Sequence, residues 1–119
     1  MSHTPLPAAL ARLSRIAALR RDRELARLSD VARAQTRIRT ALDRLEPVPL
    51  VLSPEPALVA ASLAHQRWID AQRRRLLQQL AAVSADVERQ RLPARLAFGR
   101  AQVVEALHQQ ARTGARKQD

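Results

Sequence analysis

Prolines restrict where this chain can form helices more than any other residue type. Pro5 and Pro7 stand near the start, four prolines fall between residues 47 and 56, and Pro93 stands alone. A proline inside a helix removes one backbone hydrogen bond and clashes with the preceding turn. The two long stretches that separate these prolines also contain no glycine. They therefore predict two long helices.

Two residue pairs indicate where these helices begin. Thr4 with Pro5, and Ser53 with Pro54, each place a side-chain oxygen at the N-cap and a proline at the first helical position. We therefore expect a first helix over about 5–46, a loop over 47–53 and a second helix over about 54–92.

The arrangement of these helices predicts the fold class. Two helices of near-equal length that are joined by a short loop form an antiparallel hairpin. We expect an all-α, long antiparallel two-helix coiled-coil hairpin that makes a single domain over 1–119. Pro93 should kink or break the second helix, so 94–111 is either a kinked continuation or a third helix. The polar tail over 112–119 should be frayed.

Composition favours the same fold class. The 119 residues include 23 Ala, 20 Arg, 18 Leu and 10 Gln, against two Gly and no Cys. This is the composition of a helical protein, which favours an all-α fold over an all-β or mixed one. The absence of cysteine also excludes disulfides and cysteine-ligated metal sites.

Apolar residues recur at the alternating spacing of three and four that is typical of a coiled coil. We call this line of positions, which faces the partner helix, the seam. Near the end of the first helix the seam is regular and contains one polar residue: Leu28, Val31, Gln35, Ile38, Leu42 and Leu45. Upstream it continues less regularly, with Arg21 at one expected apolar position: Leu6, Leu10, Leu13, Ala17 and Leu25. This irregularity predicts a slip of the seam between Ala17 and Leu25.

The second helix has a matching seam with an interruption. Its apolar members are Val59, Leu63, Leu76, Leu80, Val83 and Val87, and its polar interruptions are Gln66, Asp70 and Arg73. A two-helix rod covers each side chain from one side only, so a chain of this size leaves much apolar surface in water. Such a chain is either marginally stable alone or completed by a partner.

The charge limits the class of partner. The chain has 21 basic and 11 acidic residues, a net charge of +10. This surplus indicates nucleic acid, anionic lipid or an acidic protein surface, unless arginine is only the usual solvated residue of this chain. No stretch has the roughly 18 apolar residues that a membrane span needs, and the first residues lack the pattern of a secretion signal.

Residues that could support catalysis are scattered. His3, His65 and His108 do not share the helical spacing of a metal-binding pair, and no phosphate-binding or nucleophile motif is present. We therefore expect no enzyme activity, no cofactor and no metal. Trp68 is the single tryptophan and lies one position off the seam, which favours an interface anchor over a core filler.

Two segments carry a resemblance to a known family. The first is Leu-Ala-Arg-Leu-Ser-Arg-Ile-Ala-Ala-Leu-Arg-Arg-Asp-Arg-Glu-Leu over 10–25, and the second is Trp-Ile-Asp-Ala-Gln-Arg-Arg-Arg-Leu over 68–76. Together with a leucine-bearing end over 103–107, this basic, cysteine-free pattern resembles the flagellar FliJ family. Members of that family are central stalks of the type III export ATPase.

The resemblance implies partners and contact residues. The paired helix ends would lie in the pore of a hexameric export ATPase, where basic residues face acidic loops: Arg12, Arg15, Arg20, Arg95 and Arg100. The other end would reach the export gate protein through Gln35, Ile38, Leu42, Leu63 and Trp68. Chaperones of exported proteins are further implied partners. The function implied is a non-enzymatic stalk that couples the ATPase ring to the gate.

Two other functions remain open at this point. A basic helical protein can bind nucleic acid or ribosomes, although this chain has no known reader motif and almost no aromatic residues for base stacking. A coiled-coil scaffold can instead pair its uncovered apolar surface with its own copy. The expected location is the cytoplasm, at the inner face of the membrane if a secretion apparatus recruits the chain.

Overall fold

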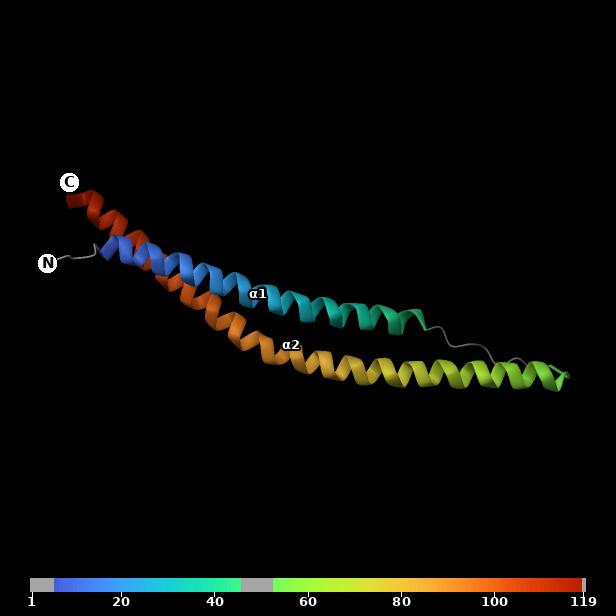
Figure 1. Cartoon of the computed structure of the whole chain (residues 1–119). Helices are drawn as coiled ribbons and strands as arrows, with labels where there is room; N and C mark the ends of the chain where they lie inside the picture. Colours follow the sequence, from blue (N-terminus) through green and yellow to red (C-terminus); the bar gives the residue numbers. More distant parts are fainter. Residues whose placement is uncertain (1–5, 46–52, 119) are drawn as a thin grey trace. The chain divides into compact units, whose positions relative to one another are not determined.

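The computed structural model describes residues 6–45 and 53–118, and they form two helices (Figure 1). Helix α1 runs over Leu6–Arg44, and helix α2 runs over Pro56–Gln118. The described residues contain no strand. The all-α prediction is therefore confirmed. Thr4, Pro5 and most of the predicted loop lie outside the described residues.

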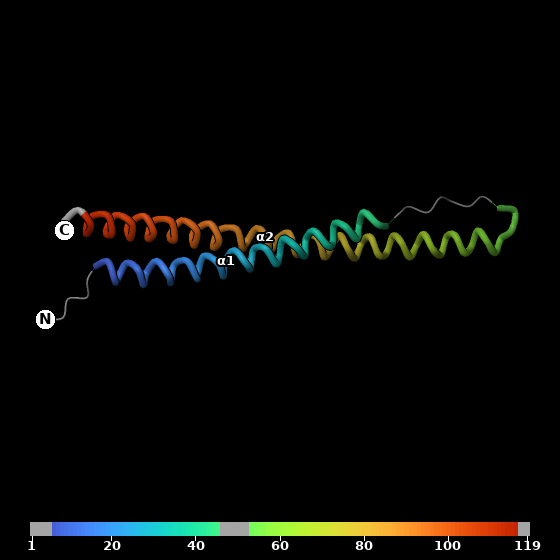
Figure 2. The backbone as a smooth tube through the Cα atoms, turned by 90° about the horizontal axis from the view of Figure 1, so that it is seen from above, coloured from blue at the N-terminus to red at the C-terminus, as the bar shows by residue number. Residues whose placement is uncertain are grey.

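Contacts group the chain into two compact units that each contain part of both helices. Unit 1 consists of residues 1–30 and 87–119, and unit 2 consists of residues 31–86. In unit 1 the start of α1 lies beside the end of α2, so the two segments are antiparallel (Figure 2). In unit 2 the end of α1 pairs in the same antiparallel sense with α2. The sequence predicted one hairpin domain and did not predict this grouping.

The seam of α1 has no slip. Half-buried side chains recur without interruption at alternating spacings of four and three, at Leu10, Ser14, Ala17, Arg21, Glu24, Leu28, Val31, Gln35, Ile38, Leu42 and Leu45. Leu13 and Leu25, which the apolar pattern predicted for the seam, are exposed instead. The prediction of a slip was wrong because polar Ser14, Arg21 and Glu24 hold regular seam positions.

The seam of α2 is equally regular. It follows Val59, Ser62, Gln66, Ile69, Arg73, Leu76, Leu80, Val83, Val87, Gln90, Ala94, Ala97, Ala101, Val104, His108 and Ala111. Ile69 is buried, whereas the predicted members Leu63 and Asp70 are exposed. Of the three predicted polar interruptions, Gln66 and Arg73 lie on the seam, whereas Asp70 is exposed because its neighbour Ile69 holds the seam position.

Helix α2 begins at Pro56, slightly later than the predicted start at about residue 54. The backbone N–H of Glu55 donates to Ser53 Oγ at 3.2 Å, and the Glu55 carbonyl accepts from the amides of Leu58 and Val59. Glu55 is therefore the last residue before the helix, and Pro56, not Pro54, holds the first helical position.

Pro93 does not end α2. The helix continues through it to Gln118, so the alternative of a separate third helix was wrong. The predicted frayed tail is helical over 112–118, and its last residue lies outside the described residues. One missing backbone bond is tolerated because strong helix formers surround the proline on both sides. In the tail, Thr113 Oγ1 donates to the Gln109 carbonyl at 2.9 Å.

The two helix segments of unit 2 differ in length. The Arg73 guanidinium donates to the carbonyl of Leu45 at 3.3 Å, which places the end of α1 level with residue 73 of α2. The turns of α2 before Arg73 therefore extend past the last residue of α1 (Figure 1). Trp68 lies on this extension.

Candidate partner-binding surface

Most seam positions of unit 1 hold small or polar residues. Its buried side chains are Val87, Ala94, Ala97 and Ala101, all on α2. Opposite them, α1 presents Ser14, Ala17, Arg21 and Glu24 between two leucines. Alanines at successive seam positions leave little room for a large side chain between the helices.

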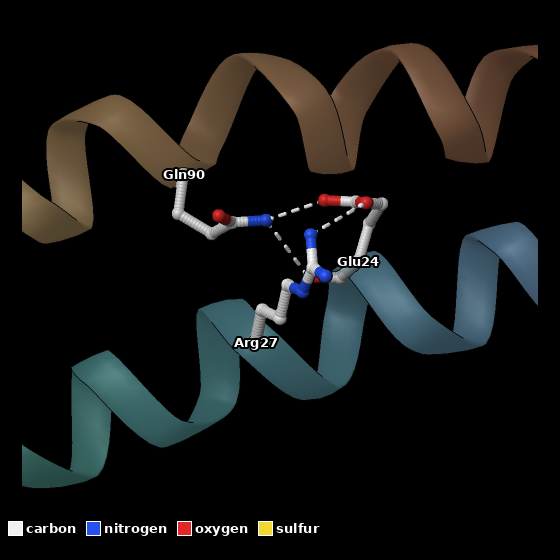
Figure 3. A network of polar contacts seen from close by, with 3 residues as sticks. All are labelled: Glu24, Arg27 and Gln90. Atoms are coloured by element: carbon white, nitrogen blue, oxygen red, sulfur yellow. Dashed lines mark hydrogen bonds and ion pairs between the residues drawn. The ribbon is translucent and has the colours of Figure 1, made fainter.

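Polar contacts join the two helices of unit 1. Gln90 Nε2 on α2 donates to Glu24 Oε2 at 2.6 Å and to the Glu24 carbonyl at 3.4 Å (Figure 3). Arg27, one turn along α1, forms an ion pair with the other carboxylate oxygen of Glu24 at 3.4 Å. Figure 3 shows the Gln90 side chain reaching across from α2 toward α1. Both carboxylate oxygens of Glu24 therefore have a polar partner within the chain.

A second polar contact lies nearer the ends of the helices. Ser14 Oγ donates to Glu105 Oε2 at 2.5 Å, and Gln109 Nε2 donates to Glu105 Oε1 at 2.9 Å. These two hydrogen bonds hold the pKa of Glu105 below its ordinary value because they favour the charged carboxylate. Polar contacts between α1 and α2 therefore help to determine which segments of the two helices pair in unit 1.

The large apolar side chains of unit 1 face away from its seam. Ten of the fourteen exposed large hydrophobic residues among the described residues belong to unit 1. They are Leu6, Leu13, Ile16, Leu19, Leu25, Leu92, Leu96, Phe98, Val103 and Leu107. Scattered exposed leucines are ordinary on a protein surface, so the candidate binding surface is the part of this set that lines a common hollow.

Part of this apolar surface forms a groove. Its volume is about 620 Å³, and its apolar wall includes Leu13 and Ile16 on α1 with Leu92 and Leu96 on α2. The charged residues of the lining are Arg20, Arg23, Arg100 and Glu24, and the remaining lining residues are Ala17, Pro93, Ala97 and Val104. We call this hollow the unit 1 groove. A second hollow of about 350 Å³ continues beyond Leu96 and Arg100, past Gly99, to Val103.

Net charge follows the same division. The residues assigned to unit 1 include 13 basic and 6 acidic residues, a net charge of +7. Those assigned to unit 2 include 8 basic and 5 acidic residues, a net charge of +3. Both the exposed apolar surface and the positive charge therefore concentrate in unit 1.

The five arginines predicted to contact an ATPase ring all lie in unit 1, and all are exposed. Arg20 and Arg100 line the unit 1 groove. Arg95 lines the neighbouring hollow. Arg12 and Arg15 line neither and lie elsewhere on α1.

The five residues predicted to contact an export gate all lie in unit 2, but they divide into two groups. Gln35, Ile38 and Leu42 are half-buried on the seam of α1, and Gln35 Nε2 donates to Ser84 Oγ at 3.0 Å. These three residues hold the helices together. Leu63 and Trp68 are exposed and remain available to a partner.

Trp68 is no core residue. Its side chain is 55% exposed and stacks on His65, with the ring centroids 6.0 Å apart and the planes 11° from parallel. The arginine run that follows it is not one patch, because Arg73 turns into the seam while Arg74 and Arg75 are exposed.

The apolar wall of the unit 1 groove was missed from the sequence. Leu13 was assigned to the seam, and Ile16, Leu92 and the groove itself were not identified. One available signal was the heptad spacing. It continues regularly from Leu28 back through Glu24, Arg21 and Ser14 if polar residues are accepted at seam positions. On that register, Leu13 and Ile16 fall beside the seam and not on it.

Several site types have no counterpart among the described residues. These residues contain no group of three or more His, Asp or Glu side chains that could hold a metal ion. Neither helix, over its described length, is long and apolar enough to cross a membrane. Comparison of the chain with known proteins finds no matching family model, no matching curated protein and no matching solved structure.

Proposed function

We propose that this chain is a non-enzymatic stalk of a flagellar or type III export apparatus, which couples a hexameric export ATPase to the export gate. The observation that carries the proposal is the concentration of exposed arginine and exposed apolar side chains in unit 1. A helical pair with one strongly basic unit is suited to docking on an acidic protein surface, since charge complementarity orients the encounter and raises its rate.

The same proposal gives unit 2 a different role. Its helices are joined by large apolar residues, and its exposed Leu63 and Trp68 offer a small apolar contact for a second protein. An export gate protein or a chaperone would bind there. The chain would act in the cytoplasm at the inner face of the membrane.

A pull-down from the native cell tests this proposal. A tagged full-length chain is washed at low and then at high salt, and the bound proteins are identified. The proposal predicts an export ATPase and gate components among the retained proteins. Ribosomal proteins and nucleic acid that leave with salt would instead support a nucleic-acid-binding protein. Recovery of the bait alone would support self-assembly.

A matched pair of variants sharpens the test. R12E/R15E reverses two exposed charges in unit 1, and R33E/R37E reverses two exposed charges in unit 2 with the same change in net charge. The proposal predicts that only the unit 1 variant loses the ATPase. Equal losses from the two variants would show attraction by net charge alone.

A further inference from the structure

The unit 1 groove is a surface that the two helices of this unit leave uncovered. Leu13 is 51% exposed and Ile16 is 49% exposed on one wall, and Leu92 and Leu96 are exposed on the other. These side chains do not contribute to the seam, where alanines and polar residues are packed. The groove therefore offers apolar area that packing between the described segments of α1 and α2 does not use.

The shape of the groove suits a third helix. It is lined by residues of α1 and α2, whose segments in unit 1 run antiparallel (Figure 2). The stretch of α1 from Leu13 to Glu24 that lines it spans about three helical turns. Ridges of side chains from a helix fill such a hollow, as in helix bundles. A flat bilayer surface would reach only the rim.

The positive charge of the groove favours an acidic partner. Arg20, Arg23 and Arg100 line it and form no ion pair within the described part of the chain. The one acidic lining residue, Glu24, already bonds Gln90 and Arg27. A second copy of this chain would bring a unit of net charge +7 against these arginines. Like charges at close range disfavour that pairing.

From these observations we propose that the unit 1 groove binds an amphipathic helix of a partner protein, with an apolar ridge against the leucines and acidic residues beside the arginines. The bound helix would complete a three-helix bundle in unit 1. Arg20 and Arg100 of this groove are also among the five arginines proposed to contact the ATPase ring, whereas Arg12 and Arg15 do not line it. The inference names the chemistry of the partner segment, and it does not require that this segment belongs to an ATPase.

Two synthetic helical peptides of about four turns test the proposal with the full-length chain. Both carry the same leucine ridge, and the flanks are glutamate in one peptide and lysine in the other. Binding is followed by fluorescence anisotropy of the labelled peptide. The proposal predicts that the glutamate peptide binds about tenfold more tightly, because up to three charge pairs form at the rim. It also predicts that added salt reduces this difference.

Variants locate the bound peptide. L13A/L96A should weaken both peptides, and R20Q/R100Q should weaken the glutamate peptide while leaving the lysine peptide unchanged or better bound. Matched controls in unit 2, L58A/L77A and R33Q/R37Q, change exposed residues of the same types and should leave binding unaltered. Circular dichroism checks that each variant is folded.

Four results would overturn the proposal. The first is no binding of the glutamate peptide, and the second is equal affinity for the two peptides. The third is equal loss from the groove variants and the unit 2 variants. The fourth is dimerisation of the free chain that L13A/L96A abolishes, which would give the groove to a second copy. None of these results depends on recovery of an export ATPase, so the proposed function is tested separately.

Discussion

The two units of this chain use the same heptad register in opposite ways. In unit 2 the seam is formed largely by Val, Ile and Leu, and few large apolar residues are exposed. In unit 1 most seam positions are alanines and polar residues, the large apolar seam residues are Leu10, Leu28, Val87 and Val104, and ten other large apolar residues are exposed. Since both units are made from the same two helices, the difference lies in where the sequence places its large side chains.

This difference indicates a division of labour. Burial of large apolar side chains is the main source of stability in helical pairs, so the seam of unit 2 is expected to stabilise its helix pairing more than the seam of unit 1 does. Unit 1 keeps comparable side chains in water, where they cost solubility and contribute little to folding. Their presence is explained when a partner covers them.

The largest expected effect concerns Pro93 in unit 1. Pro93→Ala restores a backbone hydrogen bond inside α2 and should raise the free energy of unfolding by up to about 3 kcal/mol. Thermal and urea unfolding followed by circular dichroism measure the change. Pro56→Ala, at the first helical position, is the matched control and should have little effect. Equal effects would mean that Pro93 does not weaken unit 1.

The next effect tests the small seam of unit 1. Ala101→Leu places a large side chain where the alanine is 5% exposed, and it should lower the free energy of unfolding by about 1–3 kcal/mol. Ala106→Leu changes an exposed alanine of the same helix and serves as the control. An increase in stability from Ala101→Leu would show that unit 1 is loosely packed, and the contrast with unit 2 would lose its basis.

Two isoleucines of α1 compare the units directly. Ile38 is half-buried on the seam of unit 2, and Ile16 is 49% exposed in unit 1. Ile38→Ala should cost about 1–2 kcal/mol, below the usual cost at a fully buried site. Ile16→Ala should change stability by no more than about 0.5 kcal/mol. Urea unfolding of both variants measures the two losses in free energy of unfolding. Similar losses would show that the seams of the two units do not differ in this way.

The smallest effect concerns acid. Because the pKa of Glu105 is lowered in the folded chain, its contribution to stability is present above the ordinary carboxyl pKa and is lost as the pH falls through the folded value. Ser14→Ala removes the main cause and should raise the pKa of Glu105 and reduce this acid-side loss. A nuclear magnetic resonance titration of Glu105 measures the shift. An unchanged pKa would mean that Ser14 does not reach Glu105 in solution.

Much of the fold follows from the sequence. Proline placement, helix-forming composition and heptad spacing predict two antiparallel helices, and the structure contains them. The exact ends were less predictable. Ser53 before Pro54 favours a start at Pro54, but the hydrogen bonds of Glu55 place the first helical position at Pro56. Continuation through Pro93 depends on the helix on both sides of it, which a local rule does not weigh.

The groove could not be read from hydrophobicity alone. Leu13 and Ala17 have the spacing of an apolar seam, so an apolar pattern selects Leu13 and rejects Ser14. In the structure Ser14 and not Leu13 lies on the seam. Ser14 and Glu24 form hydrogen bonds with residues of α2, and the buried alanines of α2 lie on the same seam. Pairing of polar groups over about ninety residues of sequence, as between Ser14 and Glu105, has no local signal.

Cysteine scanning of α1 in unit 1 tests the central claim most directly, because the natural chain has no cysteine. Single cysteines are placed at each position from 10 to 28, and the rate of alkylation by a maleimide is measured on the folded chain. The account predicts the slowest reaction on the observed seam: positions 10, 14, 17, 21, 24 and 28. It predicts fast reaction at positions 13, 16 and 25. Slow reaction at 13 and 25 with fast reaction at 14 and 24 would contradict it, because the large apolar residues would then form the seam of unit 1.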